Sequence, residues 1–402
     1  MKTKISLSGF CLLMIMTGAR AGTPSAYYPE NYDASRARFL AHAARLQTVY
    51  RGVETAAIPV GAENLTVDLA FIPAQSAPRN LVILTSGTHG PEGYAGSALQ
   101  TLFIEEILPT FDLAHTGVLF VHALNPWGFK HHRRGTEHNV NLNRNFGVTP
   151  EHFSTVNAEY DRLREFLEPA KTLRSSHSFP AKDLLIEMIR RRDVTQQSLT
   201  EAIGRGQFSS PEGINYGGQD FEEQTTAIQP WLKRWAEPYA AIFHIDLHTG
   251  LGKAGVLHFM TKREMNARSQ ASLKRLVADH PEDRAFFEVT PPEAEGFYEI
   301  VGDYANILAK LLPGDERTII GITAEFGTVG NGLKGKVITI NRLIMENQGH
   351  FHGYASGKIR SEVERKHLEL FYPSSPAWRE GLLKNGRYLL DTVVKRFVRE
   401  NP

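Results

Sequence analysis

Short, nearly continuous apolar runs separated by helical patterns constrain this fold more than any other feature of the sequence. We expect six of these runs to be strands: 65–73, 80–86, 117–124, 239–248, 255–261 and 318–327. Helical patterns occur at 93–107, 155–170, 181–204, 219–236, 263–279, 302–312, 335–349 and 376–399. Strands that are apolar along their whole length are typical of sheets covered on both faces. The alternation predicts an α/β fold with a mixed, largely parallel central sheet and helices on both faces.

The first 21 residues have the layout of a secretory signal peptide. Lys2 and Lys4 precede an apolar core, and the small residues Ala19 and Ala21 flank a cleavage site. The apolar core is too short to span a bilayer. We therefore expect residues 1–21 to be removed and the protein to be periplasmic or secreted, without further membrane contact. Residues 22–402 are expected to form one domain, in which the strand-poor segment 150–237 is a mostly helical insertion.

Cysteine content and charge exclude several classes of function. Cys11 is the only cysteine and lies in the expected leader, so a metal site in the mature chain must use His, Asp and Glu. The 45 Lys and Arg residues nearly balance the 44 Asp and Glu residues, which gives no indication of a nucleic-acid partner. No Gly-x-Ser-x-Gly motif indicates a serine hydrolase, and no feature favours a particular oligomeric state.

Two motifs place histidines where predicted strands end. In TSGTHGPEG (85–93), Gly87 and Gly90 permit a tight turn, and His89 and Glu92 could face one metal ion. An ordinary loop histidine beside a helix-terminal glutamate would give the same spacing. In HIDLHTGLG (244–252), strand periodicity places His244, Asp246 and His248 on one face. His248 could supply a third ligand, whereas His244 lies deeper and is expected in the core. Asp246 requires a partner such as a histidine N–H.

Two further motifs carry charged residues that could contact a substrate. Glu325 ends the apolar strand ITAEFGT (322–328), where burial would raise its pKa and allow proton transfer near neutral pH. A structural glutamate in an ion pair is the alternative. The segment 125–146 contains Asn143 and Arg144, which could bind a carboxylate through the guanidinium fork. The alternative is that this segment is an Asn-rich turn whose arginines are solvated. The histidines 131, 132 and 138 are expected at the surface.

Together, in this order, the four motifs resemble those of zinc carboxypeptidases of the M14 type. The resemblance is closest to the bacterial DUF2817 branch, near the succinylglutamate desuccinylase and aspartoacylase group, and covers about residues 60 to 345. It implies a zinc carboxypeptidase-like fold and makes 22–402 a single catalytic domain.

The resemblance also implies a role for each motif. One zinc ion per chain would be held by three ligands, His89, Glu92 and His248, leaving a position for water. Zinc would lower the pKa of that water, and Glu325 would take its proton and pass it to the leaving amine. Arg134, with Arg133 as the less favoured neighbour, would stabilise the oxyanion. Asn143 and Arg144 would bind the terminal carboxylate of the substrate.

The sequence departs from this family pattern at two points. Asn141 stands where the family often has an aspartate that supports a zinc-binding histidine, so metal affinity could be weaker. The family's mobile tyrosine has three candidates, Tyr216, Tyr298 and Tyr304, which the sequence does not separate.

The leading hypothesis is a zinc metallocarboxypeptidase that cleaves an amide bond next to a free carboxylate in peptides. The first alternative is a deacylase of N-acyl amino acids, of the desuccinylase and aspartoacylase type, which would use the same metal chemistry. The second is a relative that binds peptides without cleaving them; the presence of all three ligands and Glu325 argues against it.

Overall fold

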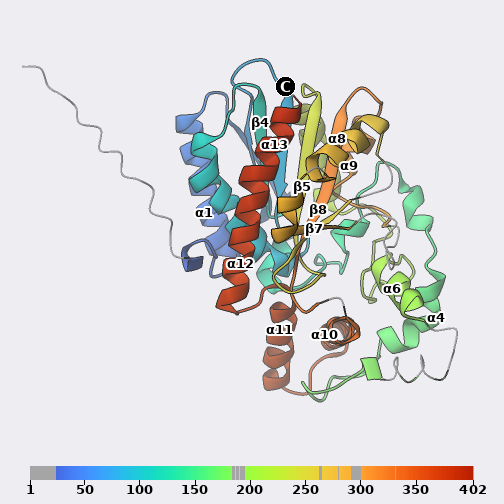
Figure 1. The fold of residues 1–402 in the computed structure, drawn as a ribbon. Coiled ribbons are helices and arrows are strands. Elements are labelled where there is room, and N and C mark those ends of the chain that lie inside the picture. Colours follow the sequence, from blue (N-terminus) through green and yellow to red (C-terminus); the bar gives the residue numbers. More distant parts are fainter. Residues whose placement is uncertain are drawn as a thin grey trace, which may run out of the picture.

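A computed structural model describes residues 24–182, 186, 190, 195–261, 265–278, 280–290, 300–330 and 332–401. These residues contain an eight-stranded sheet with the strand order β1-β2-β4-β3-β5-β8-β6-β7 (Figure 1). Its strands are β1 (Glu54–Val60), β2 (Leu65–Ile72), β3 (Asn80–Thr85), β4 (Thr116–His122), β5 (Ala241–Gly250), β6 (Leu257–Met260), β7 (Phe287–Thr290) and β8 (Thr318–Gly327).

The four central strands, β4, β3, β5 and β8, are mutually parallel, and antiparallel pairs flank them on both sides. Parallel pairing brings the carboxyl ends of β3, β5 and β8 to one edge of the sheet, where ligands bind in folds of this kind. The register places His248 of β5 directly beside Glu325 of β8. The predicted mixed, largely parallel α/β sheet is confirmed.

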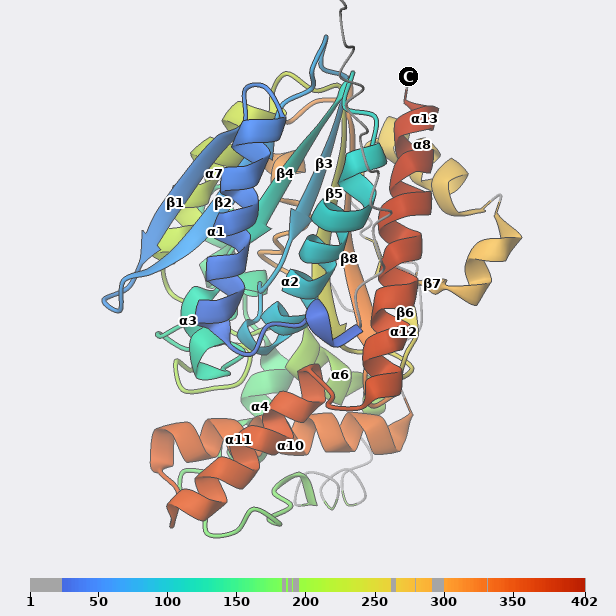
Figure 2. The same cartoon turned by 90° about the vertical axis from the view of Figure 1, so that its left-hand side faces the viewer.

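Helices cover both faces of the sheet (Figure 2). One hydrophobic core lies between the sheet and the helices α1 (Tyr32–Val49), α2 (Gly93–Leu102), α12 (Pro376–Arg387) and α13 (Val394–Glu400). The other lies beneath α7 (Glu223–Ala236) and α9 (Ile307–Leu311). The strands contribute alternate apolar residues to the two cores, as their continuous burial requires. A further helix, α8 (Ala267–Ala278), packs beside β8 and α13.

A separate helical layer lies beyond the carboxyl ends of the central strands (Figure 2). Its largest members are α10 (Leu333–His352) and α11 (Gly357–Phe371), which pack together and share a third hydrophobic core with α4 (Ala158–Leu167) and α6 (Gln196–Gly204). The short helix α3 (Pro126–His131) contacts the turn that follows β3. This layer therefore faces the edge of the sheet at which the motif residues gather.

The structure contains every strand expected from the sequence and several elements that were not expected. Strand β1 was missed because it is an edge strand with alternately exposed residues and contains Pro59. Helix α1 was missed because the polar Ser35 occupies a buried position and interrupts its apolar stripe. β7, α3 and α11 were also missed. The expected leader 1–21, Tyr298 and parts of the patterns 181–204 and 263–279 lie outside the described residues.

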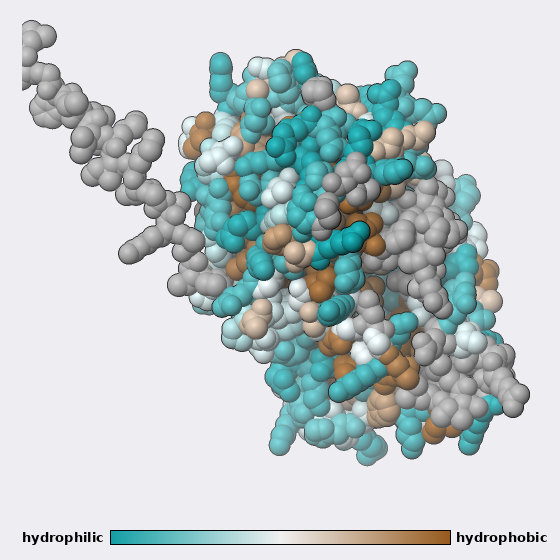
Figure 3. Space-filling view, in the orientation of Figure 1, coloured by the Kyte–Doolittle hydropathy of each residue, from teal (hydrophilic) through white to brown (hydrophobic). Residues whose placement is uncertain are grey.

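The described residues on the face of the molecule that Figure 3 shows are largely polar. In the view of Figure 3, hydrophilic residues cover most of it, and hydrophobic residues are interspersed among them. Within the described ranges, no helix combines the length and the apolar character that spanning a bilayer would require.

Candidate metal centre

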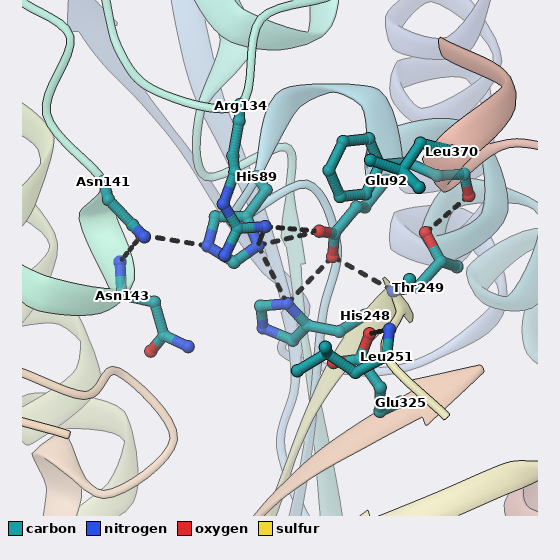
Figure 4. Close-up of polar contacts among 12 residues, drawn as sticks. His89, Glu92, Arg134, Asn141, Asn143, His248, Thr249, Leu251, Glu325 and Leu370 are labelled. Carbon is teal, nitrogen blue, oxygen red and sulfur yellow. Dashed lines mark hydrogen bonds and ion pairs between the residues drawn. The ribbon is translucent and has the colours of Figure 1, made fainter. Parts of the chain in front are cut away.

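Three donor groups from two motifs converge at the carboxyl edge of the sheet (Figure 4). His89, Glu92 and His248 each offer one ligand atom, and these atoms lie within 4.8 Å of one another. The Nδ1 atoms of the two histidines are 3.2 Å apart, and the Glu92 carboxylate lies 2.8 Å from Nδ1 of His89 and 2.9 Å from Nδ1 of His248. All three side chains are buried. Two histidine nitrogens and a carboxylate form a donor set that could hold a metal ion.

The turn after β3 positions His89 and Glu92. Gly87 has φ +68°, a left-handed conformation that favours glycine. At Gly90 a Cβ atom would collide with the backbone of Gly128 and with the carbonyl oxygen of Arg133, so only glycine lets the turn approach the next loop. The chain then enters a short 3-10 helix, Gly90–Glu92, whose Glu92 N–H bonds to the His89 carbonyl oxygen. These constraints place the two side chains on the same side of the turn.

Each histidine has its other nitrogen bound to a neighbouring group. Nε2 of His248 is 2.6 Å from Oδ2 of Asp246, whose Oδ1 accepts a hydrogen bond from the Thr88 hydroxyl. Nε2 of His89 is 2.9 Å from Oδ1 of Asn141. That oxygen also accepts from the backbone N–H of Asn143, so it is an acceptor and His89 must carry its proton on Nε2. Each Nδ1 therefore points towards the shared centre, and the residues present fit a metal ion.

Burial and charge shift the pKa values of these groups. Burial and the nearby Arg134 lower the pKa of His89 to about 4, which favours the neutral imidazole needed by a ligand. Burial would raise the pKa of Glu92, but the two adjacent histidines outweigh it and hold the carboxylate ionised. Burial would lower the pKa of His248, yet the carboxylates of Asp246 and Glu92 raise it well above its usual value.

Glu325 lies beside this centre at the end of β8. Its Oε1 accepts a hydrogen bond of 2.8 Å from the backbone N–H of Leu251. Burial, and then repulsion from the Glu92 carboxylate, raise the pKa of Glu325 to about 7. A carboxyl group with that pKa can exchange a proton near neutral pH.

Arg133 and Arg134 point in different directions. Nη1 of Arg134 lies 3.3 Å from Oε1 of Glu92, and its guanidinium is 5.7 Å from the ring of Phe371. Arg133 instead forms a buried ion pair with Glu346 of α10, at 3.1 Å. The structure therefore places Arg134, and not Arg133, next to the candidate metal ligands.

All of the candidate site residues except the buried Glu92 line one cavity of about 110 Å³. Asn143 and Arg144 are part of its wall. Asn143 Oδ1 accepts from the Tyr304 N–H, and the Arg144 guanidinium donates to the carbonyl oxygens of Asn143 and Gly204. The remaining walls come from several elements, and their residues include Ile203, Asn215, Leu251, Met260, Asp303, Leu343 and Leu370.

The structure also locates several residues whose roles the sequence did not decide. His244 is buried deeper in β5 and bonds to the Ala305 carbonyl oxygen, outside the cluster of ligands. Tyr216 and Tyr304 are buried, and no described residue that lines the cavity is a tyrosine. Thr88 and Asn215 contact the site residues but were not considered from the sequence. An Asn between glycine-rich turns, as in GINYGG (213–218), is the only signal that would have drawn attention to Asn215.

Fold and site together define a mixed α/β protein with a buried His-Glu-His cluster, beside a carboxylate and an arginine, that could bind a metal ion. A family model described as a protein of unknown function, DUF2817, matches residues 28–385. The chain belongs to this family, as its motifs predicted. No curated protein matches the chain.

Several solved structures are similar to the chain at low identity. Bovine thrombin-activatable fibrinolysis inhibitor, solved in complex with tick carboxypeptidase inhibitor, is 13% identical over 85% of this chain and 99% of its own, with a TM-score of 0.45. Carboxypeptidase A from Helicoverpa armigera is 12% identical over 88% of this chain and 76% of its own, with a TM-score of 0.47. An aspartoacylase family protein from Mesorhizobium loti is 16% identical over 74% of this chain and 67% of its own, with a TM-score of 0.35.

Proposed function

We propose that this protein is a zinc-dependent hydrolase that cleaves an amide bond next to a free carboxylate, and that it acts on peptides as a metallocarboxypeptidase. The observation that carries the proposal is the convergence of both histidine Nδ1 atoms and the Glu92 carboxylate at one point. Glu325, Arg134, Asn143 and Arg144 line the same cavity.

The proposed ligands are His89, Glu92 and His248, with one zinc ion per chain. Zinc has no redox chemistry and takes this mixture of nitrogen and oxygen donors. A bound zinc ion would supply Lewis acidity, which polarises a carbonyl group and acidifies water.

The surrounding residues would perform the remaining steps. Glu325 would accept a proton from the attacking water and return it to the leaving amine nitrogen, as its raised pKa favours. Arg134 would donate to the oxygen that gains negative charge in the transition state. Asn143 and Arg144 would bind the free carboxylate and so place the scissile amide between Arg134 and Glu325.

The proposal is tested first by the metal content of the purified protein. Elemental analysis should find about one zinc ion per chain, and it should be lost in both His89→Ala and His248→Ala. His138→Ala is the matched control, because the His138 side chain is exposed and pairs with Glu222 away from the centre. Absence of zinc after reloading, or its retention in both variants, would overturn the proposed site.

The second test separates peptides from N-acyl amino acids. The zinc-loaded protein is incubated with three kinds of compound. These are dipeptides with a free carboxyl terminus, the same dipeptides with an amidated carboxyl terminus, and N-acetyl and N-succinyl amino acids. We expect release of the terminal amino acid from free-acid peptides only. Faster turnover of the N-acyl amino acids would assign the chain to deacylation. If the zinc-loaded protein hydrolyses none of these compounds, the result would favour a protein that binds peptides without cleaving them.

A further inference from the structure

Asn215, a residue of the 150–237 segment, lines the cavity beside the candidate metal centre. Oδ1 of Asn215 accepts a hydrogen bond of 3.1 Å from Nε of Arg134 and one of 2.9 Å from Nδ2 of Asn141. Its own Nδ2 donates to the carbonyl oxygen of Ile203 at 2.7 Å. A single oxygen atom therefore joins Arg134 to the amide that orients His89.

The backbone around Asn215 fixes the position of this side chain. Asn215 has φ +53°, a left-handed conformation that asparagine tolerates better than most residues. The turn is closed by a bridge between Gln207 and Tyr216, and the Tyr216 carbonyl oxygen accepts from the Asn141 N–H at 2.7 Å. The loop that carries Asn141 is thus bound to the turn by its backbone as well as by its side chain.

The direction of every hydrogen bond in this chain of amides is determined by backbone groups at its two ends. The Ile203 carbonyl oxygen can only accept, so the Asn215 amide nitrogen faces it and the Asn215 oxygen faces Arg134 and Asn141. The Asn143 N–H can only donate, so the Asn141 oxygen faces both it and His89. The proton on His89 therefore lies on Nε2.

We propose that Asn215 is a positioning residue that holds Arg134 and His89 in a fixed relation to each other. This inference rests on the proposed function, because it assigns Arg134 to the oxyanion and His89 to zinc. It also explains why residue 141 is an asparagine. An aspartate at 141 would place a carboxylate oxygen against the Asn215 oxygen, with no hydrogen to share between them.

The first experiment compares Asn215→Gly with the unaltered protein. Glycine accepts the left-handed backbone, so the variant removes the amide without introducing strain. We expect kcat to fall about 10-fold to 100-fold with KM changed less than about threefold, because a donor to the transition state is misplaced. Zinc affinity, measured by competition with a chelator, should fall by about 10-fold because His89 loses its ordered support.

The matched control is Asn64→Gly, since Asn64 has the same left-handed backbone (φ +56°) but is exposed in the turn between β1 and β2. Asn64→Gly should change neither kcat nor zinc affinity. Unchanged kcat and zinc affinity in Asn215→Gly, or equal losses in both variants, would overturn the inference.

A double-mutant cycle tests the coupling itself. Asn141→Asp alone should lower zinc affinity. In the Asn215→Gly background the same change should leave zinc affinity unchanged or raise it, because the Asn215 oxygen that would repel the new carboxylate is absent. Additive effects would contradict the coupling.

A readout without zinc or substrate separates this inference from the proposed function. In metal-free protein, Asn215→Gly should shift the ¹⁵N resonances of His89, while Asn64→Gly should not. If the unaltered protein neither binds zinc nor hydrolyses the test compounds, the proposed function fails. The His89 resonances then decide the coupling on their own: a shift supports it and no shift overturns it.

Discussion

His89 and His248 face the same point but are supported by groups of different charge. Asp246, a buried carboxylate, accepts from His248, whereas the neutral Asn141 accepts from His89. An ionised partner makes a hydrogen bond roughly twice as strong as a neutral one. His248 is therefore the more firmly oriented histidine, and the His89 side of the centre depends on its network of amides.

Replacing the charged partner should weaken metal binding while leaving the fold intact. In Asp246→Asn the amide oxygen can still accept from His248, but the negative charge is lost, and we expect zinc affinity to fall by about 10-fold to 100-fold. Chelator competition measures the change. Asp391→Asn, which removes a carboxylate from an exposed pair with Lys395, is the control. Equal affinities for Asp246→Asn and the unaltered protein would contradict the assigned role of Asp246.

Removing the proton-transfer group should separate catalysis from metal binding. In Glu325→Gln the amide oxygen can still accept from the Leu251 N–H, so the end of β8 should keep its geometry. We expect kcat to fall by about 10²-fold to 10⁴-fold with one zinc ion still bound. Hydrolysis of a free-acid peptide and elemental analysis of the same sample test this. Substantial activity in the variant would exclude Glu325 as the proton carrier.

At the scale of secondary structure elements, the helical layer is joined to the site by a buried ion pair. Arg133 belongs to the loop that carries Arg134, and its partner Glu346 lies on α10. Arg133 also donates to Asn139 at 2.8 Å and lies 5.8 Å from the ring of Phe351. The loop and α10 are thereby fixed to each other next to the cavity.

Breaking this pair should cost far more stability than breaking an exposed one. Glu346→Ala leaves the Arg133 charge buried without its partner, and we expect a loss of about 3 to 5 kcal/mol in the free energy of unfolding. Glu364→Ala removes the partner of Arg360 on the surface of α11 and should cost less than about 1 kcal/mol. Urea unfolding of both variants gives the comparison. Similar costs would mean that the buried pair contributes no more than a surface pair.

Across the whole molecule, a buried histidine makes stability depend on pH. His122 at the end of β4 stacks on Phe39 of α1, with ring centroids 4.7 Å apart, and bonds to Gln100 of α2 at 3.0 Å. Burial, with a smaller contribution from Arg36, lowers the pKa of His122 to about 3. Between about pH 3 and about pH 6.5, the imidazole is therefore neutral in the folded protein while the unfolded chain protonates it.

The sign of the pH effect follows from this difference. Between an unfolded pKa of about 6.5 and the folded pKa of about 3, the unfolded state binds more protons, so stability is full above this range and is lost as pH falls. The slope is up to about 1.4 kcal/mol per pH unit. His122→Gln should be less stable at pH 7.5 but show a shallower decline below pH 6.5, in urea titrations at each pH. His138→Gln, changed at an exposed position, should retain the original slope.

The sequence predicts those features of the fold and site that depend on a single segment of the chain, and it does not predict contacts between distant, irregular segments. The central strands are recognisable because their apolar runs are buried on both faces. His89 and Glu92 lie in the turn after β3, and His248 and Glu325 lie near the carboxyl ends of β5 and β8. Parallel pairing then gathers them at one edge, which sequence reasoning can anticipate. Edge strand β1 and helix α1 bury only part of their surface and carry weaker patterns.

Contacts between distant, irregular segments lie beyond such reasoning. Asn215 is 74 residues from Asn141 and 81 from Arg134, and it lies in a turn with no regular periodicity. Glu346 pairs with Arg133, but nothing in the sequence of α10 shows that this glutamate is buried against an arginine of a distant loop. These residues can be assigned only once the tertiary contacts are known.

The register of β5 against β8 has a consequence for how such a protein could diversify. His248 and Glu325 are aligned by backbone hydrogen bonding, so their separation is set by the spacing of neighbouring strands. Several residues of the cavity wall, by contrast, come from the 150–237 segment and from α10 and α11, among them Asn215, Leu343 and Leu370. Lineages could therefore exchange those walls and acquire new specificities while inheriting the reactive groups unchanged.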